Sequence, residues 1–196
     1  TGTNISMATT NQESGRQYVY AVESGYPLDD DETIVSGHAA AGLLIFYKFE
    51  VMDRNLKLVA QSVPVYCGPF GIPCAPVLYQ VGVGPELGWK VESGDMHSGY
   101  GGSHLELFAD VGGAIKSILT MQTSYSNTNA VPEEEVSKST IEELWVTAKI
   151  KLPAMTPFSD IEVNMQGTRS VKGKKVELSE NSILKFDAKA GRYDSK

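Results

Sequence analysis

Leu144-Trp145-Val146-Thr147-Ala148-Lys149-Ile150-Lys151-Leu152 is the stretch that decides the fold, because apolar and polar residues alternate along most of it. Its even positions are all apolar, whereas Thr147, Lys149 and Lys151 line the other face. Successive side chains of a strand point to opposite faces of a sheet, so this period of two predicts a strand with one hydrated side. We expect the core to contain Leu144, Val146, Ala148, Ile150 and Leu152.

A second long strand is predicted over residues 43–51, where both faces begin apolar. One face carries Leu43, Ile45, Tyr47, Phe49 and Val51. The other face carries Leu44 and Phe46, and then turns polar at Lys48 and Glu50. Aromatic and branched residues at this density are typical of strands.

Shorter apolar runs bounded by Gly, Pro, Asn, Asp or Ser predict further strands. These runs are Tyr18–Val22, Leu56–Val65, Val77–Val83, Leu105–Ala109, Ile161–Met165 and Ile183–Phe186. Helix signals are few: Val136 to Leu144 fits a short helix or a lead-in, and Gly112 to Thr120 fits a helix or a strand. The pattern predicts an all-β fold, an antiparallel β-sandwich of jelly-roll-like type with little helix.

Charge and hydropathy exclude two classes of partner. The formal net charge is -7, which opposes phosphate binding, because nucleic acids are held mainly by clustered Lys and Arg. The longest apolar run, 39–46, is far shorter than the ~20 residues of a spanning helix. We therefore expect no direct contact of this segment with nucleic acid and no transmembrane segment.

Two cysteines, Cys67 and Cys74, enclose a segment with two prolines and two glycines. Such a segment favours a compact turn that would bring the sulfur atoms together. A disulfide between them and a pair of reduced thiols both remain open at this point. Neither cysteine has neighbours in the sequence that would complete a metal site.

Catalytic patterns are weak. His97 and His104 follow no spacing of a known metal motif. Ser103, His104 and Asp110 supply the residue types of a hydrolytic triad, but the G-x-S-x-G elbow is missing. We expect no enzyme activity, no cofactor and no metal.

Recognition residues are expected in two Gly-, Ser- or Asn-rich segments and at one tryptophan. The segments 98–103 and 123–135 have the composition of exposed loops, which often carry binding residues. Trp145 lies on the polar face of its strand, and tryptophan is enriched at interfaces. We expect Trp145 to contact a partner, with ordinary packing at a sheet edge as the alternative.

The residues from Arg16 to Gly25, the acidic turn 29–32 and the run Ala41 to Val51 together resemble the closing strands of a capsid shell domain. The similar family is the coat proteins of small icosahedral positive-strand RNA viruses. The resemblance implies that residues 1–52 end a shell jelly roll and that 53–196 form a protruding β domain; a single domain over 1–196 is the alternative. It also implies self-association, a place on the virion surface, and a host receptor or glycan as partner.

A second resemblance leads to a different class. The runs 42–47 and 58–66 resemble core strands of actinoporin-like cytolysins and fungal lectins, and 139–152 with 159–165 resemble strands of pore-forming β toxins. This alternative implies a secreted toxin or lectin-like protein. The acidic balance of the chain opposes binding to anionic membranes.

Overall fold

The computed structural model describes residues 2–35, 37, 40–82, 86–131, 141–150, 158–171 and 174–194. These residues form antiparallel strands with one short 3-10 turn, η1, so the predicted all-β sandwich with little helix is confirmed. The elements are β1 (Gly2–Glu13), β2 (Arg16–Tyr26), β3 (Gly42–Met52), β4 (Asn55–Gln61), β5 (Val65–Cys67), β6 (Val77–Gln80), β7 (Leu87–His97), β8 (Tyr100–Asp110), β9 (Ile115–Ser126), η1 (Thr128–Ala130), β10 (Glu143–Ile150), β11 (Ile161–Val171), β12 (Lys174–Leu184), β13 (Phe186–Asp187) and β14 (Arg192–Tyr193).

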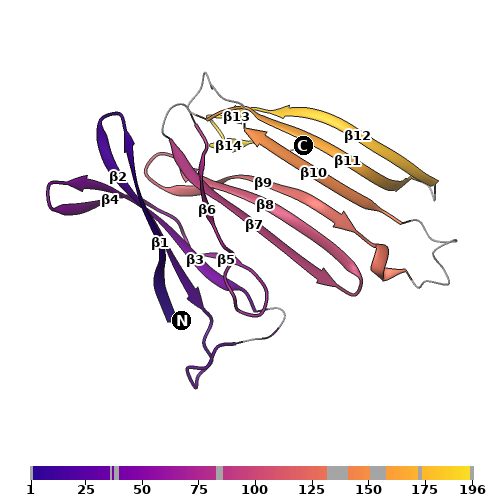
Figure 1. Cartoon of the computed structure of the whole chain (residues 1–196), viewed down its shortest axis with the longest axis horizontal. Coiled ribbons are helices and arrows are strands. Elements are labelled where there is room, and N and C mark those ends of the chain that lie inside the picture. The colour runs from indigo at the N-terminus through magenta and orange to yellow at the C-terminus, as the bar shows by residue number, and fades with distance from the viewer. Residues whose placement is uncertain are drawn as a thin grey trace.

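The first sheet has the order β1-β2-β3-β4, and β5 pairs with β3 beyond the end of β4. The second sheet has the order β12-β11-β10-β9-β8-β7-β6 (Figure 1). Most connections are therefore hairpins between neighbouring strands, whereas a jelly roll interleaves strands from its two ends. The turn between β3 and β4 contains residue 53, so the expected division of the chain at 52–53 falls between two paired strands of one sheet. That division stays a prediction.

One core lies between the two sheets. The even-numbered residues of β2 and β3 point inward, where the ring centroid of Phe46 lies 5.0 Å from those of both Trp89 and Phe108. Tyr20 also packs on Trp89, with the two ring centroids 5.3 Å apart. Ser62 links the layers, because it bridges to Ile115 of β9 and accepts a hydrogen bond at its Oγ from the Phe46 N–H.

A second core lies on the other face of the second sheet. Its buried residues include Leu107, Leu119, Val146 and Ile161, from β8 to β11. Phe158 and Ser159, just before β11, lie at the end of β6, where Phe158 bridges to Gly82 and the Ser159 N–H donates to the Val81 carbonyl at 3.1 Å. The β13–β14 hairpin covers part of this face through two ring contacts, Phe158 with Phe186 and Phe186 with Tyr193.

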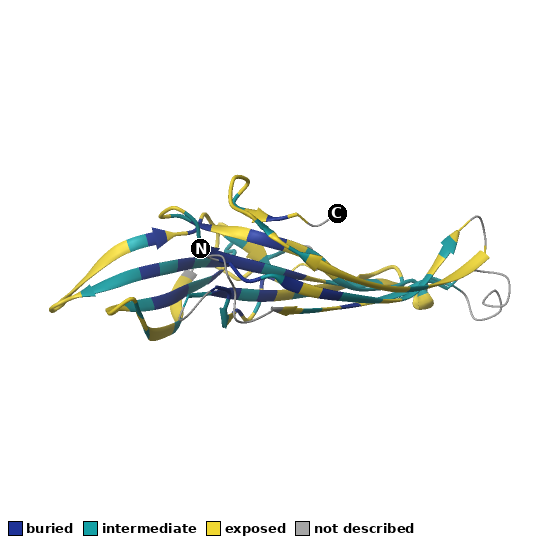
Figure 2. Ribbon diagram, turned by 90° about the horizontal axis from the view of Figure 1, so that it is seen from above, coloured by how far each residue is buried: buried dark blue, intermediate teal, exposed yellow. Residues whose placement is uncertain are grey.

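The molecule is long and thin when seen from above the view of Figure 1 (Figure 2). Buried residues gather in its middle, and both ends are covered by exposed and half-buried residues. The β11–β12 hairpin is mostly exposed along β12. A thin layer of this kind leaves large sheet faces in contact with solvent.

Several boundaries differ from the prediction. The expected strand 56–65 is two strands, β4 and β5, interrupted near Pro64, whose ring nitrogen has no proton to donate to a ladder. Gly112–Thr120 is a turn followed by β9. Of the expected helix 136–144, residues 141–142 are not helical and 143–144 belong to β10; the part before 141 lies outside the described residues.

The expected core face of residues 144–152 is confirmed at Val146, which is buried, while Leu144 and Ala148 are half-buried against the same core. The side chains of Ile150 and Leu152 lie outside the described residues.

Candidate binding cleft and assembly face

Trp145 lies on one face of the second sheet, opposite a row of small residues. It pairs with Ser124, which pairs with Ser103, which pairs with Gly94. The β8–β9 register shifts at Ser103, whose Oγ lies 3.0 Å from Thr123 Oγ1 and 2.6 Å from Ser124 Oγ, so the ladder is irregular beside Trp145. The indole is 54% exposed. Two residues further along each strand, Glu143, Ser126, Gly101 and Met96 form a second paired row.

These rows form a cleft of about 480 Å³, called here the Trp145 cleft. Its lining residues are Gly94, Asp95, Met96, Gly101, Gly102, Ser124, Tyr125, Ser126 and Trp145. Hydroxyl groups are held in place around the cleft: Ser103 Oγ lies 2.6 Å from Ser124 Oγ, and Ser126 Oγ lies 2.8 Å from Thr128 Oγ1. Thr128 in turn donates to Glu143 Oε1 at 3.1 Å. The cleft therefore combines one large exposed ring with an ordered polar floor.

The two segments expected to be recognition loops meet at this cleft, although neither is simply a loop. In the first segment, only Ser98 and Gly99 form a turn, and residues 100–103 begin β8. In the second segment, residues 123–126 end β9 and 128–130 form η1, while 132–135 lie outside the described residues. Cross-strand pairing with β7 and β9 holds the glycine-rich segment extended, against the low strand preference of glycine. Composition singled out two segments that both border this cleft, but not their conformation, and their recognition role stays a prediction.

The turn after β7 packs closely on η1 at the border of the cleft. Gly99 has a φ of 83°, and a Cβ there would lie 2.3 Å from backbone atoms of Asn129 and Ala130. Only glycine fits this approach. The tight contact positions the ends of β8 and β9 that carry the cleft residues.

A second surface of interest is the outer face of the first sheet, called here the assembly face. The odd-numbered residues of β2 and β3 point away from the core, and the register places Val19 and Leu58 on the two sides of Phe49. Tyr47 and Phe49 stack with centroids 5.8 Å apart, and Leu58 is 48% exposed. The face consists of Val19, Ala21, Ile45, Tyr47, Phe49, Val51, Leu56 and Leu58.

The charge at the assembly face is already partnered. The Tyr47 hydroxyl donates to Glu23 Oε2 at 2.6 Å. A hydrogen bond from the Thr3 side chain and this one from Tyr47 lower the pKa of Glu23, while burial and the contact with Glu23 raise the pKa of Tyr47 to about 12. The face thus offers contiguous apolar side chains with one satisfied carboxylate, an unusual outer surface for a sheet in water.

Lys48 lies on the inner face of β3, 7% exposed, between the two sheets. Its Nζ is 2.8 Å from Glu13 Oε2 and 3.8 Å from Asp110 Oδ2, and it lies over the Tyr18 ring at 4.6 Å. Tyr20 donates its hydroxyl proton to the same Glu13. The cluster is a charge-compensated contact between β1, β3 and β8, with no nucleophile beside a base.

Cys67 and Cys74 are brought together by the turn, as the sequence predicted, and both are free thiols. The Cys74 N–H donates to Cys67 Sγ at 3.2 Å. A hydrogen bond between the two side chains, with burial, raises the pKa of Cys67, and the same hydrogen bond lowers the pKa of Cys74. The disulfide stays a prediction.

The residues of the candidate triad are not assembled. Ser103 and His104 are neighbours in β8 and point to opposite faces, and Asp110 lies six residues further, about 20 Å along the strand. His104 pairs with Ser93 and Gln122 across the sheet, while His97 lies at the end of β7. Within the described ranges, no three His, Cys, Asp or Glu residues are grouped so that they could hold a metal ion.

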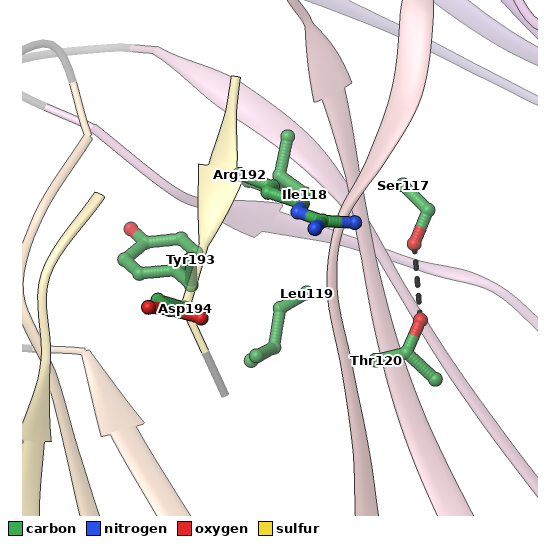
Figure 3. A pocket seen from close by; sticks show the side chains of 7 residues that line it. All are labelled: Ser117, Ile118, Leu119, Thr120, Arg192, Tyr193 and Asp194. Atoms are coloured by element: carbon green, nitrogen blue, oxygen red, sulfur yellow. Dashed lines mark hydrogen bonds between the residues drawn. The ribbon is translucent and has the colours of Figure 1, made fainter. Parts of the chain in front are cut away.

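Another pocket, of about 420 Å³, opens between β9 and β14 (Figure 3). Arg192 extends from β14 towards β9, where Ser117 Oγ and Thr120 Oγ1 lie 3.3 Å apart. Its lining residues are Ser117, Ile118, Leu119, Thr120, Arg192, Tyr193 and Asp194. They include no histidine or cysteine that could activate a hydroxyl.

The described part of the chain contains no helix with the length and hydropathy needed to cross a membrane. Together, the fold and the two surfaces define an antiparallel protein of two large sheets and one small one, with an exposed apolar face and a separate aromatic cleft. A scan against protein-family models finds no match, and searches of curated proteins and of solved structures find none either.

Proposed function

We propose that this chain is a structural protein that associates with further copies of itself through the assembly face, as the resemblance to viral coat proteins implies, and that it acts by recognition instead of catalysis. The observation that carries the proposal is the row of Ile45, Tyr47, Phe49 and Val51 on the outer side of β3, flanked by exposed leucines on β4. Burying apolar area contributes about 25 cal/mol per Å², so a face of this composition favours association.

A second copy of the chain is the occupant that suits this face best. In a twofold interface each residue meets the same surface of its partner, so like charges would face each other across the axis. The assembly face avoids this cost, because Glu23 is its single carboxylate and is bound to Tyr47. The edge of β1, mostly exposed and adjacent to β2, adds backbone groups that can extend the sheet.

Sedimentation velocity over a concentration series tests the proposal. We expect the native chain to form dimers or larger assemblies and Leu58→Glu to shift it to monomer. Ile183→Glu is the matched control, since Ile183 is 50% exposed on β12, at the far edge of the other sheet, and this variant should associate as the native chain does. A native chain that is monomeric at every concentration reached would contradict the proposal.

Liposome leakage separates this function from the toxin alternative. A structural protein should leave dye-loaded vesicles intact under conditions where it associates. A monomer that releases the dye would instead support the pore-forming reading and overturn the coat-protein one.

A further inference from the structure

We propose that the Trp145 cleft binds an uncharged sugar, with one face of a pyranose ring stacked on the Trp145 indole and its hydroxyl groups bonded to the serine floor. The proposal is independent of self-association, because the cleft lies on the second sheet and the assembly face lies on the first.

The indole of Trp145 is open to a ligand. The chain has two tryptophans: Trp89 is 1% exposed at the centre of the first core, whereas Trp145 is 54% exposed. Leaving a large indole in water forgoes about 25 cal/mol for each Å² of apolar area that could be buried. The face of an indole carries partial negative charge, which attracts the weakly positive C–H groups of a sugar ring.

Glycine and serine residues form the floor of the cleft beside the indole. Gly94 and Gly101 have no side chain, so a flat ring can approach the backbone of β7 and β8 beside Trp145. Ser124 and Ser126 supply hydroxyl groups, each already oriented by a neighbouring hydroxyl. A hydroxyl both donates and accepts hydrogen bonds, as the hydroxyls of a sugar do, so the two sets can pair in many arrangements.

The charge of the cleft selects the kind of sugar. Among the described residues that line it, none is basic and one, Asp95, is acidic. Glu143 lies on the same face beside Ser126, and Glu142 precedes it. Burial raises the pKa of Tyr125, with a smaller contribution from the nearby Glu142 carboxylate. An anionic ligand such as a sulfated or carboxylated sugar would be repelled.

The size of the cleft fits a small ligand. Its volume of about 480 Å³ lies in the range of ~300–1,000 Å³ that is usual for small-molecule sites. Contact with one ring and a few hydroxyls gives modest affinity, so we expect a Kd on the order of 1 mM for a single sugar.

The test uses the intact chain and the methyl glycosides of glucose, galactose, mannose and N-acetylglucosamine as probes. Tryptophan fluorescence reports the site, because Trp89 is buried and its emission should not respond to a sugar. We expect saturable change with at least one glycoside, and saturation-transfer NMR should show the ring C–H protons closest to the protein.

Three variants locate the binding. Trp145→Ala should abolish the saturation-transfer signal while leaving the melting temperature within a degree or two, since the side chain is exposed. Gly101→Val keeps the indole but fills the floor; a Cβ there meets only Met96 Cε, at 3.8 Å, so the fold should be retained and binding lost. Tyr66→Ala removes a ring that is even more exposed, at 70%, from β5 in the first sheet, and this variant should bind as the native chain does.

Two results would overturn the proposal. One is the lack of saturable binding for all four glycosides. The other is binding that survives both Trp145→Ala and Gly101→Val, which would place the sugar elsewhere. Because association is measured separately by sedimentation, a failure here leaves the assembly result unaffected.

Discussion

At the scale of single residues, Lys48 shows how a charge can lie between two sheets. Its Nζ is compensated by Glu13 and Asp110 and lies against two tyrosine rings, so most of its lost hydration is replaced. Removing the cation alone leaves Glu13 in a site where its side chain is 13% exposed. We expect Lys48→Met to lower the free energy of unfolding by about 3 kcal/mol, measured by urea titration.

The double variant Lys48→Met with Glu13→Gln is the control for that prediction. It removes the uncompensated carboxylate as well, so it should recover part of the loss. A Lys48→Met protein as stable as the native chain would show that the cluster is solvated and contributes little.

A second residue-scale prediction concerns Glu106, which lines the same pocket as Cys67 and Gly68. Burial raises its pKa above the usual 4.5, opposed by His104. The folded protein therefore binds this proton more tightly than the unfolded chain does. The stabilisation is complete below the unfolded pKa and is lost as pH rises through the folded pKa.

Glu106→Gln should be more stable than the native chain at pH 7, and the difference should shrink as pH falls towards 4.5. Urea unfolding across that pH range measures it, and a constant difference would contradict the assignment.

At the scale of elements, β3 shows what sequence reasoning could and could not predict. Alternation over 43–51 correctly predicts a strand with two distinct faces. The more apolar face, with Tyr47 and Phe49, points outward, and the face that turns polar at Lys48 points inward. The reason lies in partners on β1 and β8, Glu13 and Asp110, which no local pattern reveals.

The Trp145 cleft illustrates the same limit. Trp145 and the segments 98–103 and 123–135 are each recognisable by residue type. Their meeting depends on the register of β7 to β10, which joins residues up to about fifty positions apart in the chain. Long-range strand pairing of this kind has no signature in a single sequence.

The turn between β5 and β6 carries an element-scale prediction. With its pKa lowered by the hydrogen bond from Cys67, Cys74 should react first with iodoacetamide, and a disulfide donor such as oxidised glutathione should join the two thiols. Closing this eight-residue loop should stabilise the fold by about 2 kcal/mol. Mass spectrometry of alkylated peptides and thermal unfolding check both. Equal alkylation of the two cysteines, or a mixed disulfide that never resolves, would contradict the paired geometry.

At the scale of the whole molecule, charge and apolar surface act in opposite directions on association. Copies of a chain with net charge -7 repel one another, while the assembly face attracts through apolar contact and carries no unpaired charge that would need a partner across the interface. Raising NaCl from about 20 mM to about 500 mM shortens the Debye length from about 20 Å to about 4 Å and screens the repulsion. Association should therefore strengthen with salt, seen as a lower midpoint concentration in sedimentation. Interfaces held by ion pairs behave in the opposite way, so weaker association at high salt would place the contact on the charged surfaces of β12, with Lys174, Lys175 and Glu177, instead of on the first sheet.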